Sequence, residues 1–360
     1  MGNGTFVGLD VHARSVVAGL IDEDTGELRM TREPHRTEEL VGWLGDLGGP
    51  VRVAYEAGPS GFGLARALEA AGIWCLVAAP SLIARSPAGR ARKSDVSDAE
   101  HLARLVRRGE LTAVRVPDPV DEAARDQVRA REDARADLMR ARHRLSKLLL
   151  RHGLVFEEGR AWTARHQAWL RAQRLEHPGA RAAFEDYYGA VLGAGLRREG
   201  LDRQIAQMAS EPRLAPLVGR LSCLRGVGTL TAFALAVEIG DFHRLTGRTI
   251  GAYFGLVPSE SQSGARHARG PITKAGNSHA RRLLVEAAWH HRPAVRASTA
   301  IERRRASQRP EVAARAEQAG LRLHQRWHHL ERRRGLRSTV VATAVARELA
   351  GWCWSLAVME

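Results

Sequence analysis

Four acidic residues in the first hundred positions have the types and spacing of a metal site that acts on nucleic acid. Asp10 ends the strand-like run TFVGLD, Glu56 ends the run VRVAYE, and Asp95 and Asp98 lie in KSDVSDAE. Magnesium takes hard oxygen ligands, and two such ions about 4 Å apart can hold the attacking and leaving oxygens of a phosphodiester. Singly, each acid could be structural, as a strand end, a partner of an arginine or a helix cap. As an ordered set, the four favour a metal site.

An alternation of strands and helices is expected to position these acids. Three strands are followed by helix, strand, helix and strand, over 5–12, 15–22, 27–32, 37–47, 51–56, 60–72 and 74–80. This order predicts a mixed sheet covered by helices on both faces, the ribonuclease-H type of fold, with acids at the ends of the first and fourth strands and on a late helix. Asp95 and Asp98 begin a helix that runs to about Arg108, and their spacing puts both on one helix face.

A long helical insertion is expected next. From 119 to 155, apolar residues recur every three or four positions among charged ones, which predicts an amphipathic helix with coiled-coil character. A second apolar series from Val191 to Met208 predicts the other arm of an antiparallel pair. The aromatic residues between the two series favour packing over base stacking; they are Trp162, Trp169, Phe184, Tyr187 and Tyr188.

The segment after the prolines at 212 and 216 has features of phosphate contact. LRGVGT (224–229) is similar to the turn of helix-hairpin-helix modules, whose glycines let backbone N–H groups approach a phosphate. A helix is then expected to begin near Asn277, with Asn277 or Ser278 as its cap. The tail after 286 is expected to be mostly helical, ending in an apolar helix that packs on the core.

Three serines precede a basic stretch in a polar, glycine-rich segment. They are Ser259, Ser261 and Ser263, and Arg266, Arg269 and Lys274 follow them. A serine beside glycine and arginine is a candidate nucleophile at a phosphate, because arginines can stabilise the developing negative charge. A phosphate-binding loop with no covalent role explains the same composition.

Charge indicates the class of partner. The chain has 360 residues, a formal net charge of +15 and a pI near 11.0, so an anionic partner is expected, with nucleic acid as the first candidate. Basic runs at 303–305 and 332–334 are typical either of a solvated face or of contacts to a nucleic-acid backbone. Three widely spaced cysteines, no leader-like N-terminus and no long apolar stretch predict a cytoplasmic protein without a zinc site or membrane span.

Five segments, in order, resemble the DEDD transposases of bacterial insertion sequences, which are related to Piv-type DNA invertases and act as bridge-RNA-guided recombinases. These segments are GLDVH (8–12), YEAGPSGFGLARAL (55–68), KSDVSDAEHLARL (93–105), LRGVGTLTAFALAVEIGD (224–241) and GLVPSESQSGARHARGPITKAGNSHARRLL (255–284). The resemblance spans roughly residues 5–285, and its second half is the more specific. The basic tail after 285 does not match the family pattern.

The resemblance implies an α/β plus α architecture with three parts, to which the unmatched tail adds a fourth. The three are a RuvC-like DEDD nuclease domain (1–118), a helical coiled-coil domain (119–215) and a mainly helical transposase domain with the catalytic serine (216–290), and the fourth is a basic helical extension (291–360). It implies that Asp10, Glu56, Asp95 and Asp98 bind Mg²⁺ and that Ser263, which precedes a glycine, attacks DNA and holds it as a phosphoserine.

The same resemblance implies the partners of the chain. They are target and donor DNA, a non-coding bridge RNA that pairs with both, and further copies of the chain in a dimer or tetramer joined through the helical insertion. Contacts to nucleic acid are expected from Lys93, Arg225, Arg266, Arg269, Lys274 and Arg281.

Two other functions use parts of the same pattern. A site-specific invertase or metal-dependent junction nuclease would use the same acids without an RNA, and a resolvase would not need Ser263. A non-enzymatic architectural protein that binds nucleic acid would account for the positive charge. The four placed acids argue against it, because a pure binder gains nothing from anionic charge facing phosphate.

Overall fold

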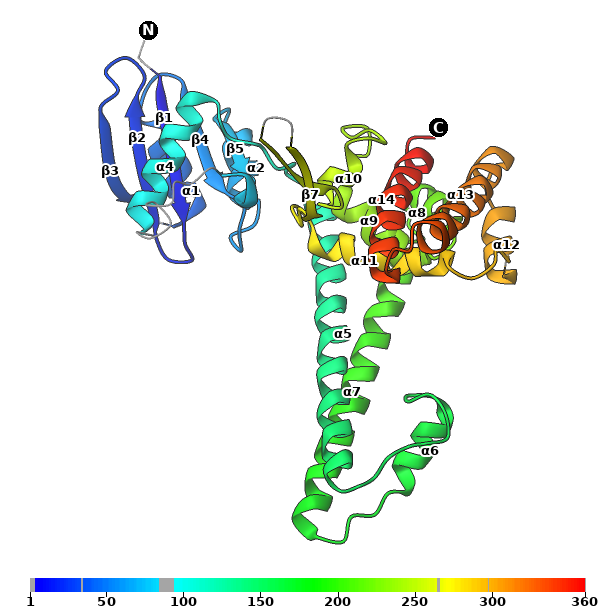
Figure 1. Ribbon diagram of the computed structural model, residues 1–360. Helices are drawn as coiled ribbons and strands as arrows, with labels where there is room; N and C mark the ends of the chain where they lie inside the picture. The colour runs from blue at the N-terminus through cyan, green and yellow to red at the C-terminus, as the bar shows by residue number, and fades with distance from the viewer. Residues whose placement is uncertain (1–3, 34, 84–93, 264–265, 297, 360) are drawn as a thin grey trace. The chain divides into compact units, whose positions relative to one another are not determined.

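The computed structural model describes residues 4–33, 35–83, 94–263, 266–296 and 298–359, with the backbone alone described at 261–263 and 266–267. The chain divides into two compact units, Met1–Asp118 and Pro119–Glu360. The first unit is α/β and the second is almost entirely helical (Figure 1).

A five-stranded mixed sheet forms the centre of the first unit, with the strand order β3-β2-β1-β4-β5. Strand β1 pairs antiparallel with β2, which pairs antiparallel with β3, and on its other side β1 pairs parallel with β4, which pairs parallel with β5. The strands are Thr5–Val11, Val16–Asp22, Leu28–Glu33, Val51–Glu56 and Trp74–Ala78. The mixed sheet predicted from the sequence is therefore confirmed.

Helices cover both faces of this sheet. Leu40 and Leu44 of α1 and Leu68 of α2 pack on the face that carries Val7 and Leu9, whereas α4 packs on the opposite face. The helices are α1 (Thr37–Gly45), α2 (Gly63–Ala70), the short 3₁₀ turn η1 (Pro80–Leu82) and α4 (Asp95–Arg108). The three α-helices follow the predicted order, and α4 begins and ends at the predicted residues, whereas η1 was not predicted.

Two glycines let α4 lie directly on the backbone of the sheet. A Cβ atom on Gly8 of β1 would lie 2.3 Å from the carbonyl oxygen of Ala99 and from the amide nitrogen of Ala103. A Cβ atom on Gly19 of β2 would lie 3.1 Å from the backbone of Ala99. Because neither strand carries a side chain at the crossing, the axis of α4 is set close to β1, and its first turn is held near the end of that strand.

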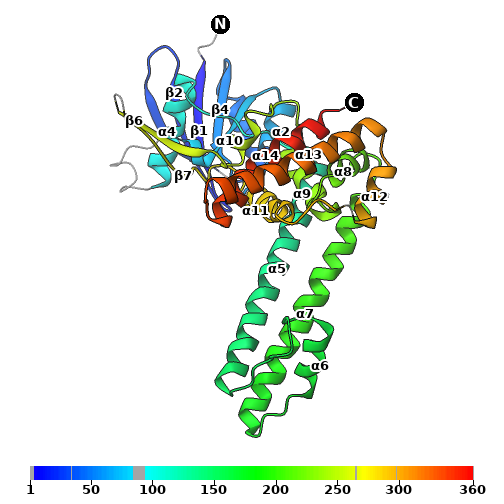
Figure 2. The ribbon, with the colours of Figure 1, turned by 45° about the vertical axis from the view of Figure 1, so that its right-hand side comes forward.

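A two-helix arm extends from the second unit (Figure 2). Helices α5 (Pro119–Arg151) and α7 (Pro178–Met208) pack side by side. They run antiparallel, since Arg131 contacts Asp202 and Asp137 contacts Arg197. The predicted pair of amphipathic helices is confirmed.

The end of the arm is an aromatic cluster. Helix α6 (Ala164–Ala172) and the loops around it bring Trp162 and Trp169 against the arm, where Phe184 is buried. His166 is buried among these rings and stacks on Trp169 at a centroid distance of 5.6 Å. These rings are used in packing, as predicted.

The body of the second unit is a helical core. Helices α14 and α9 each contribute more of its buried side chains than any other element, and α14 is the apolar terminal helix expected from the sequence. Its elements are α8 (Ala215–Ser222), α9 (Thr229–Ile239), α10 (Ile250–Tyr253), α11 (Ser278–Ala288), η2 (Trp289–His291), α12 (Thr299–Ala306), α13 (Pro310–His328), the π-helical turn η3 (His329–Arg333) and α14 (Ser338–Ala357). Among the described residues, no helix combines the length and the apolarity needed to cross a membrane.

A β-hairpin interrupts this helical body. Strands β6 (Pro258–Ser263) and β7 (Arg266–Ile272) pair antiparallel, with Ser263 opposite Arg266. The sequence predicted only a polar, glycine-rich segment here. The segment PSESQS does not alternate apolar and polar residues, so its sequence does not predict a strand. The hairpin therefore depends on its backbone hydrogen bonds.

Candidate metal centre and nucleic-acid interface

Asp10 and Glu56 lie at the ends of adjacent parallel strands and point to the same face of the sheet. The β1–β4 register pairs Gly8 with Ala54 and Leu9 with Tyr55, so Asp10 and Glu56 are the next residues along each strand. Gly8 and Ala54 face α4, and side chains alternate between faces. Both carboxylates therefore project toward the face that α4 covers.

The start of α4 brings the second pair of acids to this strand end. Ser94 is the N-cap, because its hydroxyl accepts from the amide of Ser97 and the Ser97 hydroxyl accepts from the amide of Ser94. Asp95 and Asp98 follow in the first helical turn, where the helix dipole favours negative charge. Since Ser94 caps the helix, Asp95 is not needed as a cap.

His12 joins Asp10 and Asp95 into one group of potential ligands. Its Nε2 atom lies 3.2 Å from Oδ2 of Asp10 and 3.5 Å from Oδ1 of Asp95. One ligand atom from each of the three residues falls within 4.8 Å of the others. The Asp10 side chain is 23% exposed, whereas those of His12 and Asp95 are about half exposed, so the group opens to solvent on one side. His12 was not predicted to be a site residue, although it stands two residues after Asp10 in GLDVH.

The pKa of Asp10 reflects its burial first and the neighbouring charges second. Partial burial raises the pKa of this carboxyl above its ordinary value, and the carboxylates of Asp95 and Asp98 raise it further. His12 acts in the opposite direction but does not cancel these effects. A divalent cation among these oxygens would relieve the repulsion, and carboxylate and imidazole are ligands that such ions accept. The residues present therefore fit a metal ion.

The four predicted acids are placed by different observations. Asp10 and Asp95 belong to the ligand group, and Asp98 is near enough to raise the pKa of Asp10. Glu56 is placed by strand register at the neighbouring strand end.

In the second unit, the predicted basic residues differ in exposure. Arg269 and Lys274 are exposed on or just after β7, and Arg269 Nε lies 3.4 Å from Glu260. Lys274 has a left-handed backbone conformation with φ of 56°. Lys274 lies where two segments cross closely, because a Cβ atom on Gly255 would lie 2.7 Å from the carbonyl carbon of Lys274. A non-glycine residue in this conformation is strained, and such strain gathers at functional sites.

Arg225 and Arg281 make internal contacts. Arg225 Nη2 donates to the carbonyl of Ala294 at 2.9 Å, and burial lowers the pKa of its guanidinium. Arg281 Nη1 donates to the carbonyls of Phe254 and Ala275, both at 2.8 Å. Lys93 and the side chains of Ser263 and Arg266 lie outside the described residues.

Two local observations bear on the other motifs. The Ser259 hydroxyl donates to the carbonyl of Pro271 at 3.1 Å, which ties it to the hairpin. In LRGVGT, a Cβ atom on Gly226 would lie 2.4 Å from the carbonyl oxygen of Ala287. Close packing on α11 is therefore enough to require a glycine at 226, and the glycine alone is not evidence of a phosphate contact.

Comparisons with known proteins match both units. A DEDD transposase model matches residues 7–153, and the model described as "Transposase IS116/IS110/IS902 family" matches residues 218–303. The protein y4qE of Sinorhizobium fredii, named as a transposase, is 39% identical over 98% of this chain and 88% of its own length. The transposase for insertion sequence element IS1533 of Leptospira borgpetersenii is 32% identical over 91% of this chain and 97% of its own. The transposase for IS1328 of Yersinia enterocolitica is 26% identical over 66% of this chain and 70% of its own.

Proposed function

The chain belongs to the DEDD transposases of the IS116/IS110/IS902 family, and from this premise we propose that the Asp10–His12–Asp95 group is the centre at which it cuts and rejoins DNA. The observation that carries the proposal is the convergence of Asp10 and Asp95 around His12, at a strand end that also carries Glu56. Transposition of DNA is the activity of this family, and the chain is an enzyme of phosphodiester transfer.

The first unit is proposed to be a RuvC-like nuclease domain of the ribonuclease-H type. The strand order β3-β2-β1-β4-β5 and the packing of α4 over β1 support this assignment. The proposed boundaries are those of the sequence analysis, namely 1–118, 119–215, 216–290 and 291–360.

Magnesium is the proposed ion, held by Asp10, Glu56, Asp95 and Asp98. When bound, such an ion polarises a phosphodiester and stabilises the negative charge that develops on its oxygens. His12 contacts Asp10 and Asp95 directly, so its role in this chain is to orient both carboxylates. The Ser94–Ser97 capping pair fixes the helix start from which Asp95 and Asp98 project.

Ser263 is the proposed nucleophile. Its hydroxyl oxygen would bond to phosphorus as the bond from phosphorus to one DNA oxygen breaks, which leaves a DNA hydroxyl end and a serine–phosphate ester. Attack by another DNA hydroxyl on that ester restores the serine, so no ATP is needed. Support comes from the glycine that follows Ser263 and from the engagement of the Ser259 hydroxyl by Pro271. In sequence, Arg269 and Lys274 are the first Arg and Lys residues after Ser263 whose side chains the structure describes.

A bridge RNA and an oligomer complete the proposal. Family resemblance supports an RNA that pairs with target and donor DNA. The arm is the proposed contact between copies, because Leu192 and Leu196 are 47% and 70% exposed one helical turn apart on α7.

The metal proposal is tested by Asp10→Asn in the full chain. Strand exchange in Mg²⁺ should be lost, binding of duplex DNA in EDTA should be retained, and the rise in melting temperature on adding Mg²⁺ should disappear. Asp24→Asn is the matched control, since Asp24 is an exposed acid of the same unit. Full strand exchange by Asp10→Asn would exclude this metal centre.

The serine proposal is tested by trapping the intermediate under denaturing conditions. The wild type should give a protein–DNA adduct that survives SDS and disappears with protease. Ser263→Ala should lose the adduct, whereas Ser261→Ala should keep it. An adduct that persists in Ser263→Ala would move the nucleophile to another serine.

The RNA proposal is tested on protein purified from cells. A discrete RNA should accompany the chain, and removing it should stop recombination. Full activity of the RNA-free protein would favour an invertase mechanism in its place.

A further inference from the structure

Two arginine runs in the C-terminal region look alike in sequence but are used differently. In the run at 303–305, Arg304 Nη1 donates to the carbonyl of Val227 at 2.9 Å. Arg305 donates to the carbonyls of Cys223 and Ala316, both at 3.3 Å. These two guanidinium groups satisfy backbone carbonyls of the core, which makes them structural.

The second run lies on the surface. Arg332, Arg333 and Arg334 are exposed, and no ion pair to Arg332 or Arg333 occurs within the described parts of the chain. The π-helical turn η3 carries the first two of these arginines at the end of α13. Trp327 and Leu330 anchor this turn because both are buried. π-Helical turns are rare and occur frequently at functional sites.

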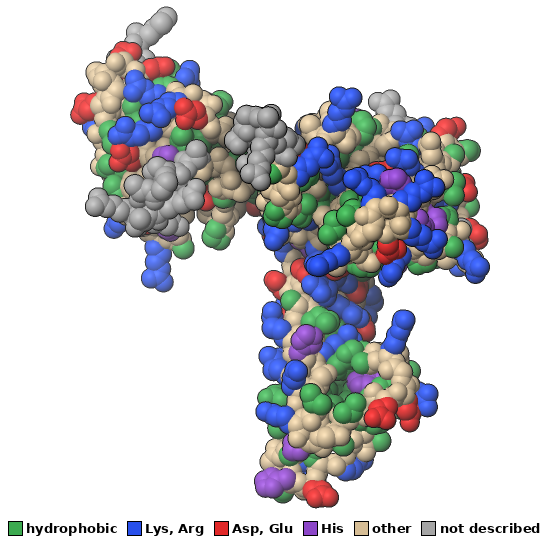
Figure 3. All heavy atoms as spheres, viewed as in Figure 1, with side chains coloured by type: hydrophobic (Ala, Val, Ile, Leu, Met, Phe, Trp, Pro, Cys, Tyr) green, Lys and Arg blue, Asp and Glu red, His purple; other side chains and the backbone are tan. Residues whose placement is uncertain are grey.

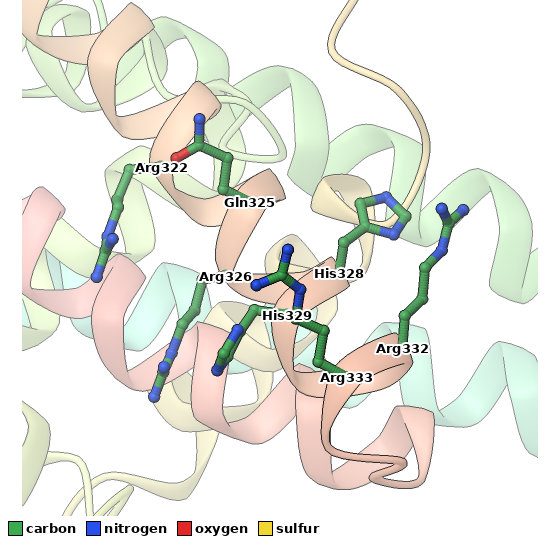
Figure 4. A pocket seen from close by; sticks show the side chains of 7 residues that line it. All are labelled: Arg322, Gln325, Arg326, His328, His329, Arg332 and Arg333. Carbon is green, nitrogen blue, oxygen red and sulfur yellow. The ribbon is translucent and has the colours of Figure 1, made fainter.

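These arginines share a hollow with the last turns of α13. The hollow has a volume of about 600 Å³, and none of its lining residues is acidic; they are Arg322, Gln325, Arg326, His328, His329, Arg332 and Arg333. Lys and Arg side chains gather over the helical body on the face shown in Figure 3. Figure 4 shows Arg322 and Arg326 on one side of the helix and Arg332 on the other, with Arg333 between them.

Glu348 of α14 contacts this surface from one side. Its carboxylate lies 3.0 Å from Arg322 Nε and 3.7 Å from Arg326 Nε. One carboxylate cannot neutralise two guanidinium groups, so the surface remains positive. Trp327 is fully buried beneath it. Because the lining offers no aromatic ring apart from the two imidazoles, a base-stacking role of the kind seen with single strands is disfavoured.

We propose that this surface, formed by Arg322, Arg326, Arg332 and Arg333, binds the sugar–phosphate backbone of duplex DNA. The inference rests on the proposed function, which supplies DNA as the substrate. From 322 to 333 the helix extends roughly 16 Å, and duplex DNA carries about one charge per 1.7 Å of its axis. Arginines on both sides of one helix can reach both phosphate backbones when the helix lies in a groove. The major groove of B-form DNA is wide enough to admit a helix, whereas the major groove of A-form RNA is too narrow.

The test measures equilibrium binding of the full chain to a 30-base-pair duplex DNA of arbitrary sequence, in EDTA, over a range of salt concentrations. The double variant Arg332→Gln, Arg333→Gln should lose affinity by about tenfold or more near 0.1 M salt, and the slope of log affinity against log salt should fall by about two. A matched control, Arg151→Gln with Arg171→Gln, removes the same charge from exposed positions on the arm. Its affinity should stay within about twofold of the wild type.

Two further variants separate charge from fold. Arg332→Lys with Arg333→Lys keeps the charge and should keep the salt slope, so a loss there as large as in the glutamine variant overturns the proposal. Glu348→Gln removes the carboxylate that competes for Arg322 and Arg326 and should raise affinity several-fold. A purely structural role for these residues predicts no such gain, so unchanged or weaker binding by folded Glu348→Gln also overturns it.

The identity of the ligand is tested with a duplex RNA of the same length. The glutamine variant should weaken DNA binding more than RNA binding. Equal losses for both duplexes, or equal losses in the arm control, would overturn the assignment to DNA. The measurement involves no cleavage, so failure of the metal or serine proposals would leave its outcome unaffected.

Discussion

The two units each contain a carboxylate cluster, and the clusters have opposite surroundings. In the first unit, Asp10 and Asp95 share one histidine, and the pKa of Asp10 is raised by burial and by neighbouring acids. In the second unit, Glu238 is buried between α5, α9 and α11, yet its pKa is lowered. Burial raises the pKa of Glu238, but His279, Arg129 and Arg125 outweigh that effect.

The acids of the cluster in the second unit have hydrogen-bond donors and cationic partners. Asn277 Nδ2 donates to Glu238 at 2.7 Å, and Arg129 Nε lies 3.9 Å from the same carboxylate. Glu132 nearby contacts Arg282 and Arg135. His279 lies between the two acids, 3.6 Å from Glu132 and 3.9 Å from Glu238.

The difference indicates how to separate functional from structural carboxylates. Where the fold supplies donors and cations for each acid, the acids join elements, here the arm helix α5 to α9 and α11. Where the fold gathers acids so that one raises the pKa of another, as Asp95 and Asp98 do for Asp10, a bound cation would relieve the repulsion. Mutations should therefore affect activity in the first cluster and stability in the second.

The largest effect is expected for Asp95→Asn. Strand exchange should fall at least roughly a hundredfold, because a proposed metal ligand is lost. The melting temperature should stay unchanged or rise, because Asp95 is half exposed among like charges and Ser94 supplies the helix cap. Strand exchange and thermal unfolding of the same preparation check both parts. If Asp95→Asn kept its strand exchange but lost stability, Asp95 would be a structural acid and the proposed difference between the two clusters would be wrong.

The opposite pattern is expected for Glu238→Ala. Removing this carboxylate leaves Asn277 without its acceptor and His279 and Arg125 without their counter-charge, which should lower the unfolding free energy by about 3 kcal/mol. Chemical denaturation of the full chain gives the value. Glu286→Ala is the control, because its ion pair with Arg282 is exposed and its loss should cost under about 1 kcal/mol. Equal losses of unfolding free energy in the two variants would show that burial of Glu238 among its partners adds nothing to stability.

A third prediction concerns the position of α4. Gly8→Ala places a methyl group 2.3 Å from the backbone of α4, so the helix must shift, at a cost of about 1–3 kcal/mol. The shift moves Asp95 away from Asp10 and should weaken stabilisation by Mg²⁺. In Gly19→Ala the nearest atoms lie at 3.1 Å, and a smaller effect is expected. Calorimetric melting with and without Mg²⁺ distinguishes the two variants.

The smallest effect is a pH dependence of stability. The folded-state pKa values of Glu238 and Glu132 lie below the ordinary value of 4.5. Their stabilisation is therefore complete above pH 4.5 and is lost as the pH falls through the folded-state values, with a slope of at most about 1.4 kcal/mol per pH unit for each acid. Denaturation of wild type and Glu238→Gln between pH 3 and 7 should show the two curves converging in acid. A constant difference across this range would show that the charge of Glu238 is not what stabilises the unit.

Much of the site could be predicted from local pattern. The strands of the sheet occur where the sequence alternates with helical segments, and α4 begins where a capping residue precedes Asp95. The two arm helices occur where apolar residues recur every three or four positions. Asp10 and Glu56 reach one face because side chains alternate along a strand and both stand at corresponding strand ends. Such features depend on neighbours within a few residues, so the order of amino acids determines them.

Contacts between distant segments were decided by the tertiary structure. His12 joined the acids because β1 ends beside the first turn of α4, and the hairpin at 258–272 formed without an apolar pattern. The runs at 303–305 and 332–334 have the same composition, yet the first holds core carbonyls and the second faces solvent. A charged side chain carries no local signal of its partner, because that partner is whichever backbone or side chain folding brings near it.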